Sequence, residues 1–230
     1  MPPELIVMLT QHDRTVDNAL ELFDTLKDTP IQHWGFKDVG LPPAQMKKLV
    51  STMRNAGKTT YLEVVSLSEP EGLAGARLAT EAGFDVLMGT VFFDSIAEYL
   101  TDKSPRYYPF PGRVHSHPSI LEGSITEITE HARYLEAMGA HGLDLLTYRY
   151  TGDAPSLLKA VVKAVQVPLV SAGSIASFER IREVWHCGAW GFTIGSAFFE
   201  ASFVPGADFK TNMMAVWDWL HKEDELEAAL

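Results

Sequence analysis

The chain has 230 residues, of which 46% are hydrophobic and 21% charged, so it is long enough for one large core and ordinary for a globular protein. Its formal net charge of −11 argues against a general binder of nucleic acid or of a membrane surface, because such proteins need a basic face. The single cysteine, Cys187, excludes an internal disulfide and a multi-cysteine metal site.

We expect one domain over residues 1–230, located in the cytoplasm. No run approaches the roughly 18 apolar residues of a membrane span, and the first residues, MPPELIVMLT, lack a basic region and a cleavage signature.

Short apolar runs alternate with amphipathic segments eight times along the chain. The predicted strands are residues 5–9, 33–37, 60–65, 84–88, 106–110, 142–147, 168–171 and 191–194. The predicted helices between them include residues 15–27, 43–55, 71–81, 126–138, 156–165 and 178–186, and residues 114–124 are expected to form a long loop. Repeated βα units predict parallel strands, and eight of them favour an α/β fold of the (β/α)8 barrel type. A doubly wound open sheet is the alternative.

Two ionisable residues interrupt apolar strands. Lys37 ends the strand HWGFK, and Glu63 lies within the run TYLEVV. Because a lone buried charge is costly, we expect Lys37 and Glu63 to face each other in the barrel mouth. Glu63 would then act as a base and Lys37 would stabilise an enolate or oxyanion. The alternatives are a purely structural ion pair and, for Lys37, a side chain that extends outward to solvent.

Histidines follow two of the predicted strands. His12 lies after the first strand, at the expected catalytic end of the barrel. The alternative is that it caps the first helix together with Asp13. His115 and His117 form an H-x-H pattern that fits two metal ligands or an acid–base pair. No third ligand has a definable spacing, so we predict no metal and assign His117 to proton transfer.

Charged residues also mark the sixth strand. Arg149, just after it, is predicted to clamp a substrate carboxylate or phosphate, although an exposed surface charge is the alternative. Asp144 and Asp85 lie near the starts of their strands, at the end of a barrel opposite the usual active site, so we expect both to be structural.

Two strands near the C-terminus end in small-residue turns. Gly173 and Ser174 follow one strand, and Gly195 and Ser196 follow the next. Glycine lets backbone N–H groups approach an anion, and the loops after the seventh and eighth strands of such barrels commonly hold phosphate. The alternative is that these glycines only permit tight turns.

The segment 84–93 is similar to segment 190–199, which lies about half a barrel later. If this similarity reflects duplication, Gly89 and Thr90 hold a second anionic group of the substrate. Shared turn chemistry is the alternative explanation.

Residues 167–200, VPLVSAGSIASFERIREVWHCGAWGFTIGSAFFE, resemble the phosphate-binding segments of the ribulose-phosphate-binding barrel superfamily. The resemblance implies a barrel that binds phosphate at Gly173, Ser174, Gly195 and Ser196. It also implies chemistry at the C-terminal ends of the other strands. We predict no cofactor.

Two classes of function follow from this resemblance. The first is an isomerase, epimerase, lyase or aldolase that acts on a phosphorylated small molecule such as a sugar phosphate. The second is a non-catalytic barrel that senses a phosphorylated ligand, because the segments FFDS (92–95) and PFPG (109–112) resemble the glycerol-uptake antiterminators. The acidic charge disfavours an RNA-acting regulator, an inactive barrel is a third alternative, and homo-oligomerisation is left open.

Overall fold

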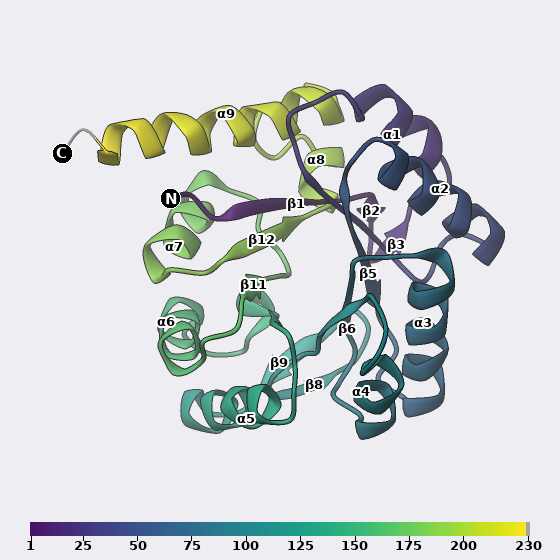
Figure 1. Cartoon of the computed structure of the whole chain (residues 1–230). Coiled ribbons are helices and arrows are strands. Elements are labelled where there is room, and N and C mark those ends of the chain that lie inside the picture. Colours follow the sequence, from purple (N-terminus) through teal and green to yellow (C-terminus); the bar gives the residue numbers. More distant parts are fainter. Residues whose placement is uncertain (229–230) are drawn as a thin grey trace.

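The computed structural model describes residues 1–228. Eight parallel strands form one sheet that curls into a nearly closed barrel, in the order β10-β11-β12-β1-β4-β5-β6-β7 (Figure 1). The barrel strands are β1 Glu4–Met8, β4 His33–Lys37, β5 Thr59–Val64, β6 Val86–Gly89, β7 Arg106–Tyr108, β10 Leu143–Leu145, β11 Leu169–Ser171 and β12 Gly191–Ile194. Each predicted strand overlaps one of these, so the predicted (β/α)8 barrel is confirmed and the open-sheet alternative is wrong.

The barrel closes between its two end strands, β7 and β10. The N–H of His141 donates to the carbonyl of Tyr107 at 2.9 Å, and the N–H of Asp144 donates to the carbonyl of Pro109 at 3.1 Å. These backbone hydrogen bonds place β10 beside β7 and so close the ring.

Helices surround the strands, and α9 extends outward toward the C-terminus (Figure 1). The helices are α1 Ala19–Leu26, α2 Pro43–Asn55, α3 Glu69–Ala82, α4 Asp94–Leu100, α5 Ile125–Ala137, α6 Ala154–Ala164, α7 Phe178–Cys187, α8 Ser196–Phe199 and α9 Phe209–Ala228, with a 3-10 turn η1 at Thr147–Arg149. Within residues 1–228, no helix combines the length and the apolar character that a bilayer crossing needs.

Two hairpins depart from the simple βα rhythm. Strands β2 (Thr10–Gln11) and β3 (Arg14–Thr15) pair antiparallel and delay the start of α1 beyond the predicted residue. Strands β8 (Arg113–His115) and β9 (Ile120–Glu122) form a second hairpin where a long loop was expected. The loop prediction is wrong because three residues on each side suffice for a short antiparallel ladder.

Strand residues alternate between two apolar layers. One set packs between the sheet and the helices, and the other fills the barrel interior. The interior set consists of Ile6, Met8, Tyr61, Val86, Met88, Tyr108 and Val170. Burial on both faces explains why the strands read as nearly continuous apolar runs. Polar side chains that point inward near the C-terminal ends of these strands therefore meet at one site.

Candidate active site

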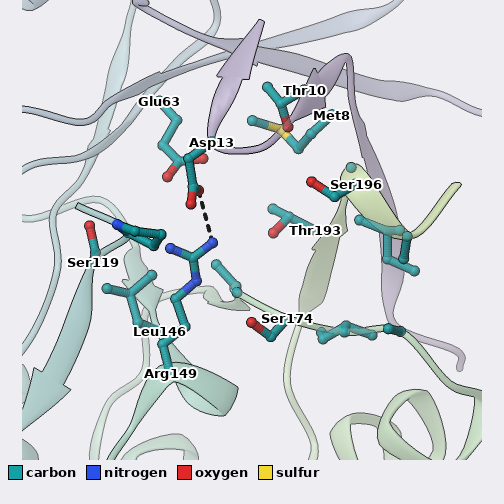
Figure 2. Close-up of a pocket in the computed structure, with 18 of the residues that line it drawn as sticks. Met8, Thr10, Asp13, Glu63, Ser119, Leu146, Arg149, Ser174, Thr193 and Ser196 are labelled. Carbon is teal, nitrogen blue, oxygen red and sulfur yellow. Dashed lines mark hydrogen bonds and ion pairs between the residues drawn. The ribbon is translucent and has the colours of Figure 1, made fainter. Parts of the chain in front are cut away.

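A cavity of about 500 Å³ opens at the C-terminal ends of the barrel strands (Figure 2). Its walls come from the ends of β1, β4, β5, β11 and β12, the β2–β3 turn and the tip of the β8–β9 hairpin. This is the end of a (β/α)8 barrel at which substrates bind.

One wall of the cavity consists of the two predicted phosphate turns. Gly173, Ser174, Gly195 and Ser196 all line it. Gly173 has φ +81°, and Ser174 has φ +58°, which is unusual for a residue with a side chain. A Cβ at Gly195 would lie 2.4 Å from Thr10 Oγ1 and 2.8 Å from the Thr10 carbonyl oxygen, so only glycine fits there.

Arg180, which was not among the predicted site residues, adds a cation to this wall. The residue lies in the first turn of α7. Ser177 is the N-cap residue of this helix, and its hydroxyl oxygen accepts a hydrogen bond from the Arg180 N–H at 3.3 Å. The Arg180 guanidinium donates to the Ser174 carbonyl and lies 4.7 Å from the centre of the Tyr148 ring. Because a helix N-terminus disfavours positive charge, an anion in the cavity would stabilise Arg180 in this position.

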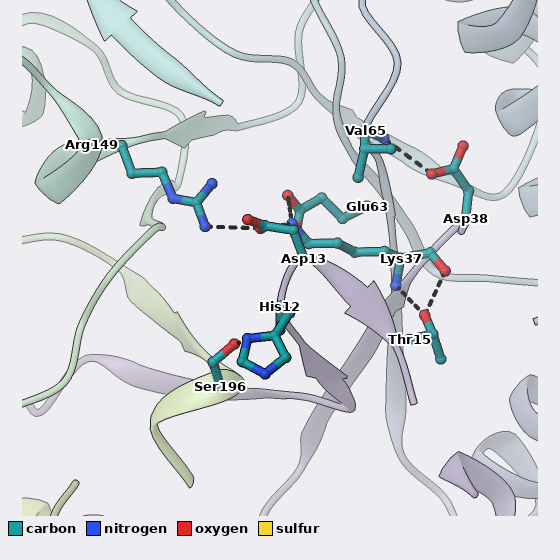
Figure 3. A network of polar contacts seen from close by, with 9 residues as sticks. All are labelled: His12, Asp13, Thr15, Lys37, Asp38, Glu63, Val65, Arg149 and Ser196. Atoms are coloured by element: carbon teal, nitrogen blue, oxygen red, sulfur yellow. Dashed lines mark hydrogen bonds and ion pairs between the residues drawn. The ribbon is translucent and has the colours of Figure 1, made fainter. Parts of the chain in front are cut away.

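The floor of the cavity is a buried ion-pair network (Figure 3). Lys37 Nζ lies 3.2 Å from Glu63 Oε1 and 2.8 Å from Asp13 Oδ1. Lys37 and Glu63 are each 8% exposed, and they occupy directly paired positions on β4 and β5. The prediction that Lys37 and Glu63 face each other in the barrel mouth is confirmed.

Asp13 connects this pair to Arg149. Arg149 Nη2 donates to Asp13 Oδ1 at 2.8 Å, so one carboxylate oxygen bridges two cations. The Arg149 side chain passes beside the glycine turns of this cavity, because a Cβ at Gly173 would lie 2.9 Å from Arg149 Cγ. Arg149 therefore spans the space between these turns and the Lys37–Glu63 pair.

The β2–β3 hairpin holds Asp13 in place. His12 and Asp13 form its two-residue turn, with φ +49° and +60°. Thr15 Oγ1 donates to the Lys37 carbonyl at 2.7 Å, and the His12 N–H donates to Ser196 Oγ at 3.1 Å. His12 and Asp13 therefore do not cap the first helix, whose N-cap residue is Asn18.

Charge pairing sets the protonation states of this floor. Burial alone would raise the pKa of Asp13, but the Lys37 and Arg149 cations outweigh it and lower the pKa to about 2. Burial alone would lower the pKa of Lys37, but the Glu63 and Asp13 carboxylates outweigh it and raise the pKa above its usual value. Lys37 is therefore a charged ammonium at neutral pH, suited to stabilise negative charge rather than to attack as a neutral amine.

A further carboxyl group lies just outside the cavity lining. Asp38 follows β4, and its Oδ1 accepts a hydrogen bond from the Val65 N–H at 3.1 Å (Figure 3). Burial raises the pKa of Asp38 to about 6, and the nearby Glu63 carboxylate adds to this shift.

The two histidines of the H-x-H pattern lie in different surroundings. His117 lines the cavity from the tip of the β8–β9 hairpin, whereas His115 pairs with Ser116 Oγ at 2.8 Å and lies 3.4 Å from Glu122. In the described part of the chain, no three His, Cys, Asp or Glu side chains are grouped as a metal site would require. His117 thus shares the cavity with Lys37 and Glu63, and His115 does not.

Gly89 and Thr90 do not line the cavity. Thr90 is fully buried, and a Cβ at Gly89 would lie 2.5 Å from the Val64 carbonyl oxygen. The predicted second anion site at Gly89 and Thr90 therefore needs correction, because their turn packs against the end of β5 instead of facing a ligand.

The two aspartates that were expected to be structural have different surroundings. Asp85 accepts hydrogen bonds from the N–H and Oγ1 of Thr60, both at 2.8 Å, and is structural as predicted. Asp144 lies inside the barrel, close enough to Glu63 and Lys37 to interact with their charges. The prediction that Asp144 faces away from the site is wrong, because β10 is short and Asp144 is already level with the deep part of the site.

No protein-family model and no curated protein sequence matches this chain. Solved structures with the same fold include orotidine 5′-phosphate decarboxylase from Pyrococcus horikoshii OT3, with a TM-score of 0.68 and 13% identity over 94% of this chain and 99% of that one. KDPGal aldolase has a TM-score of 0.65 and 15% identity over 95% and 94%. The glycerol uptake operon antiterminator regulatory protein from Listeria monocytogenes has a TM-score of 0.57 and 15% identity over 84% and 91%.

These likenesses are distant in sequence and show a shared fold. The barrel that the resemblance of residues 167–200 implies is therefore confirmed at the level of the fold.

Proposed function

We propose that the protein is an enzyme that acts on a phosphorylated small molecule, by isomerase, epimerase, lyase or aldolase chemistry. The observation that carries this proposal is that one cavity holds both the paired glycine turns and the buried Lys37–Glu63 ion pair. The similar fold of enzymes whose names include phosphate-bearing substrates, such as orotidine 5′-phosphate decarboxylase, supports it. A single phosphorylated ligand would contact both features.

The phosphate anchors the unreactive end of the substrate. The turns at Gly173–Ser174 and Gly195–Ser196 supply backbone N–H groups, and Arg180 supplies positive charge beside them. Binding energy from this remote group then orients the reacting carbon at the cavity floor. Arg149, which lies between the two regions, contacts the middle of the substrate.

Proton transfer takes place at the floor. Glu63 removes a proton from a carbon next to a carbonyl, and the Lys37 ammonium stabilises the negative charge that develops on the carbonyl oxygen. Because Lys37 remains charged, we favour proton transfer through an enolate over chemistry that begins with a neutral lysine. His117 donates or accepts a proton from the mouth side.

Regulation by ligand sensing is the second candidate function, favoured by the similar fold of the antiterminator protein. A sensor needs the phosphate turns, but it has no evident need for a buried Lys37–Glu63 pair within reach of the ligand. The two functions are distinguished by turnover.

The test is a panel of phosphorylated aldoses, ketoses and keto acids, with exchange of substrate protons for solvent deuterium followed by NMR. We expect exchange or turnover of at least one compound, and a loss of roughly 10²-fold or more in Glu63→Gln at nearly unchanged affinity. Glu81→Gln is the matched control, since Glu81 forms an exposed pair with Lys47. Binding without exchange or turnover in the unmodified protein would reject the enzyme and favour the sensor.

A further inference from the structure

Asp144 is a buried carboxyl group that neither the proposed proton transfer nor the barrel packing uses. Its side chain is 0% exposed, and neither carboxyl oxygen has a hydrogen-bond partner within residues 1–228. Buried polar groups are hydrogen-bonded in the great majority of cases, so a carboxyl group without a partner needs an explanation.

The position of Asp144 within β10 directs it into the barrel. Its neighbours Leu143 and Leu145 pack in the layer between sheet and helices, so the Asp144 side chain lies on the opposite, interior face. Its register partner on β11, Val170, belongs to the interior cluster. Asp144 does not line the cavity, although it is close enough to the floor to interact with the charges of Glu63 and Lys37.

Charged groups on three elements interact electrostatically with Asp144. Glu63 on β5 disfavours its ionised form, whereas Lys37 on β4 and Arg149 on η1 favour it. The backbone N–H of Gly89 on β6 also favours ionisation, without meeting the geometry of a hydrogen bond. Tyr61 on β5 and Tyr108 on the adjacent β7 are the titratable side chains of the interior cluster, and burial raises the pKa of each, so both stay neutral.

The cavity above Asp144 is already balanced in charge. Its lining contains three cationic side chains and three carboxylates, which are Lys37, Arg149, Arg180, Asp13, Glu63 and Glu200. Each carboxylate of the floor is in contact with Lys37. An ionised Asp144 would therefore add one uncompensated negative charge beneath a site that has to accept an anion.

We infer that Asp144 carries a proton in the resting protein and, acting through Glu63 and Lys37, keeps the site at zero net charge. Burial is the main cause, because it raises the pKa of Asp144 well above its usual value, and the Glu63 carboxylate adds to this effect. When two nearby carboxyl groups are driven to different protonation states, one is defined as acid and the other as base. Asp144 is thus a positioning residue that leaves Glu63 as the base and leaves room for the negative charge of the ligand.

The first test measures protonation directly and needs no ligand. In an infrared difference spectrum at pH 7 between the unmodified protein and Asp144→Asn, we expect the carbonyl band of a protonated carboxylic acid. Carboxylate bands in its place would overturn the inference. If Asp144→Asn does not fold, NMR of the unmodified protein labelled with ¹³C at aspartate carboxyl groups gives the same answer from the pH titration of the interior carbon.

The second test measures the role in binding and rests on the proposed phosphate site. Affinity for inorganic phosphate is followed from neutral to alkaline pH in both proteins. Because inorganic phosphate itself loses a proton as the pH rises through neutrality, the two proteins are compared at each pH. We expect the affinity of the unmodified protein to fall about tenfold or more relative to that of Asp144→Asn over the pH range in which the acid band disappears. If the band persists to the alkaline limit of the folded protein, the ratio of the two affinities should stay constant.

Loss of the band without loss of affinity would overturn the charge-setting role. Failure of phosphate to bind either protein, with the acid band present, would instead reject the proposed function and leave the protonated state of Asp144 established.

Discussion

The Lys37 ammonium and the Glu63 carboxylate form an ion pair across directly paired positions of β4 and β5, with 3.2 Å between Nζ and Oε1. Asp13 approaches the same ammonium from the β2–β3 turn, at 2.8 Å. Lys37 is thus the one cation shared by the two carboxylates of the cavity floor.

Lys37→Met should destabilise the protein strongly, because it leaves two buried carboxylates without this cation. We expect the free energy of unfolding to fall by about 3–5 kcal/mol, measured by urea denaturation. Lys47→Met removes an exposed pair with Glu81 and should cost less than about 1 kcal/mol. Adding Glu63→Gln to Lys37→Met should restore part of the loss, and a double variant that is no more stable than Lys37→Met would contradict the pairing.

Acid should weaken the protein through Asp13. The folded-state pKa of about 2 lies below the ordinary 3.8, so the unfolded chain takes up this proton first as the pH falls. The stabilisation from Asp13 is therefore complete above about pH 4 and is lost progressively toward pH 2. In urea denaturation at several pH values, the free energy of unfolding should depend less steeply on pH across this window in Asp13→Asn than in the unmodified protein. Equal pH dependence in the two proteins would argue against the Lys37–Asp13–Arg149 bridge.

Gly195→Ala should disturb both the fold and anion binding. Its new Cβ meets the backbone of Thr10, which cannot move aside like the end of a long side chain, and we expect a loss of roughly 1–3 kcal/mol. Gly139→Ala is the control for a glycine substitution away from the cavity: unlike Gly195, Gly139 has a positive φ, but its Cβ would meet nothing within 4 Å. Isothermal titration with inorganic phosphate should show weaker binding in Gly195→Ala alone.

Arg180→Met should weaken phosphate binding without unfolding the protein. A charge-assisted hydrogen bond is worth about 1.5–3 kcal/mol, which corresponds to a decrease in affinity of roughly 10- to 100-fold. Arg182→Met, two residues later on α7, removes an arginine that pairs with Glu223 away from the cavity. Comparable losses of phosphate affinity in the two variants would show that Arg180 does not contact the bound phosphate.

The fold was predictable because apolar runs and turn residues agree along the chain. Each βα unit has a run long enough for a buried strand, and glycines such as Gly83 and Gly188 end helices in the left-handed conformation. The pairing of Lys37 with Glu63 followed from the same pattern, since neighbouring strands of a parallel barrel place their C-terminal ends side by side.

Three charged residues of the site region were not predictable in the same way. Asp13 forms the β2–β3 hairpin turn together with His12, and this turn lacks the glycine or asparagine that usually indicates a two-residue hairpin turn in a sequence. Arg180 belongs to a helix, and only the start of α7 after Ser177 turns it toward the cavity. Asp144 depends on how β10 is staggered against β7, which is decided when the barrel closes and leaves no local sequence pattern.

The turn formed by His12 and Asp13 has a consequence for how tightly a ligand can bind. Two consecutive side-chain-bearing residues with positive φ are seldom populated in a free chain, and the contacts from Thr15 and Ser196 hold them there. Lys37 and Arg149, whose long side chains would otherwise sample many rotamers, are already ordered by the Asp13 carboxylate. The conformational entropy of both side chains is therefore lost when the protein folds, and a ligand that enters the cavity does not lose it again.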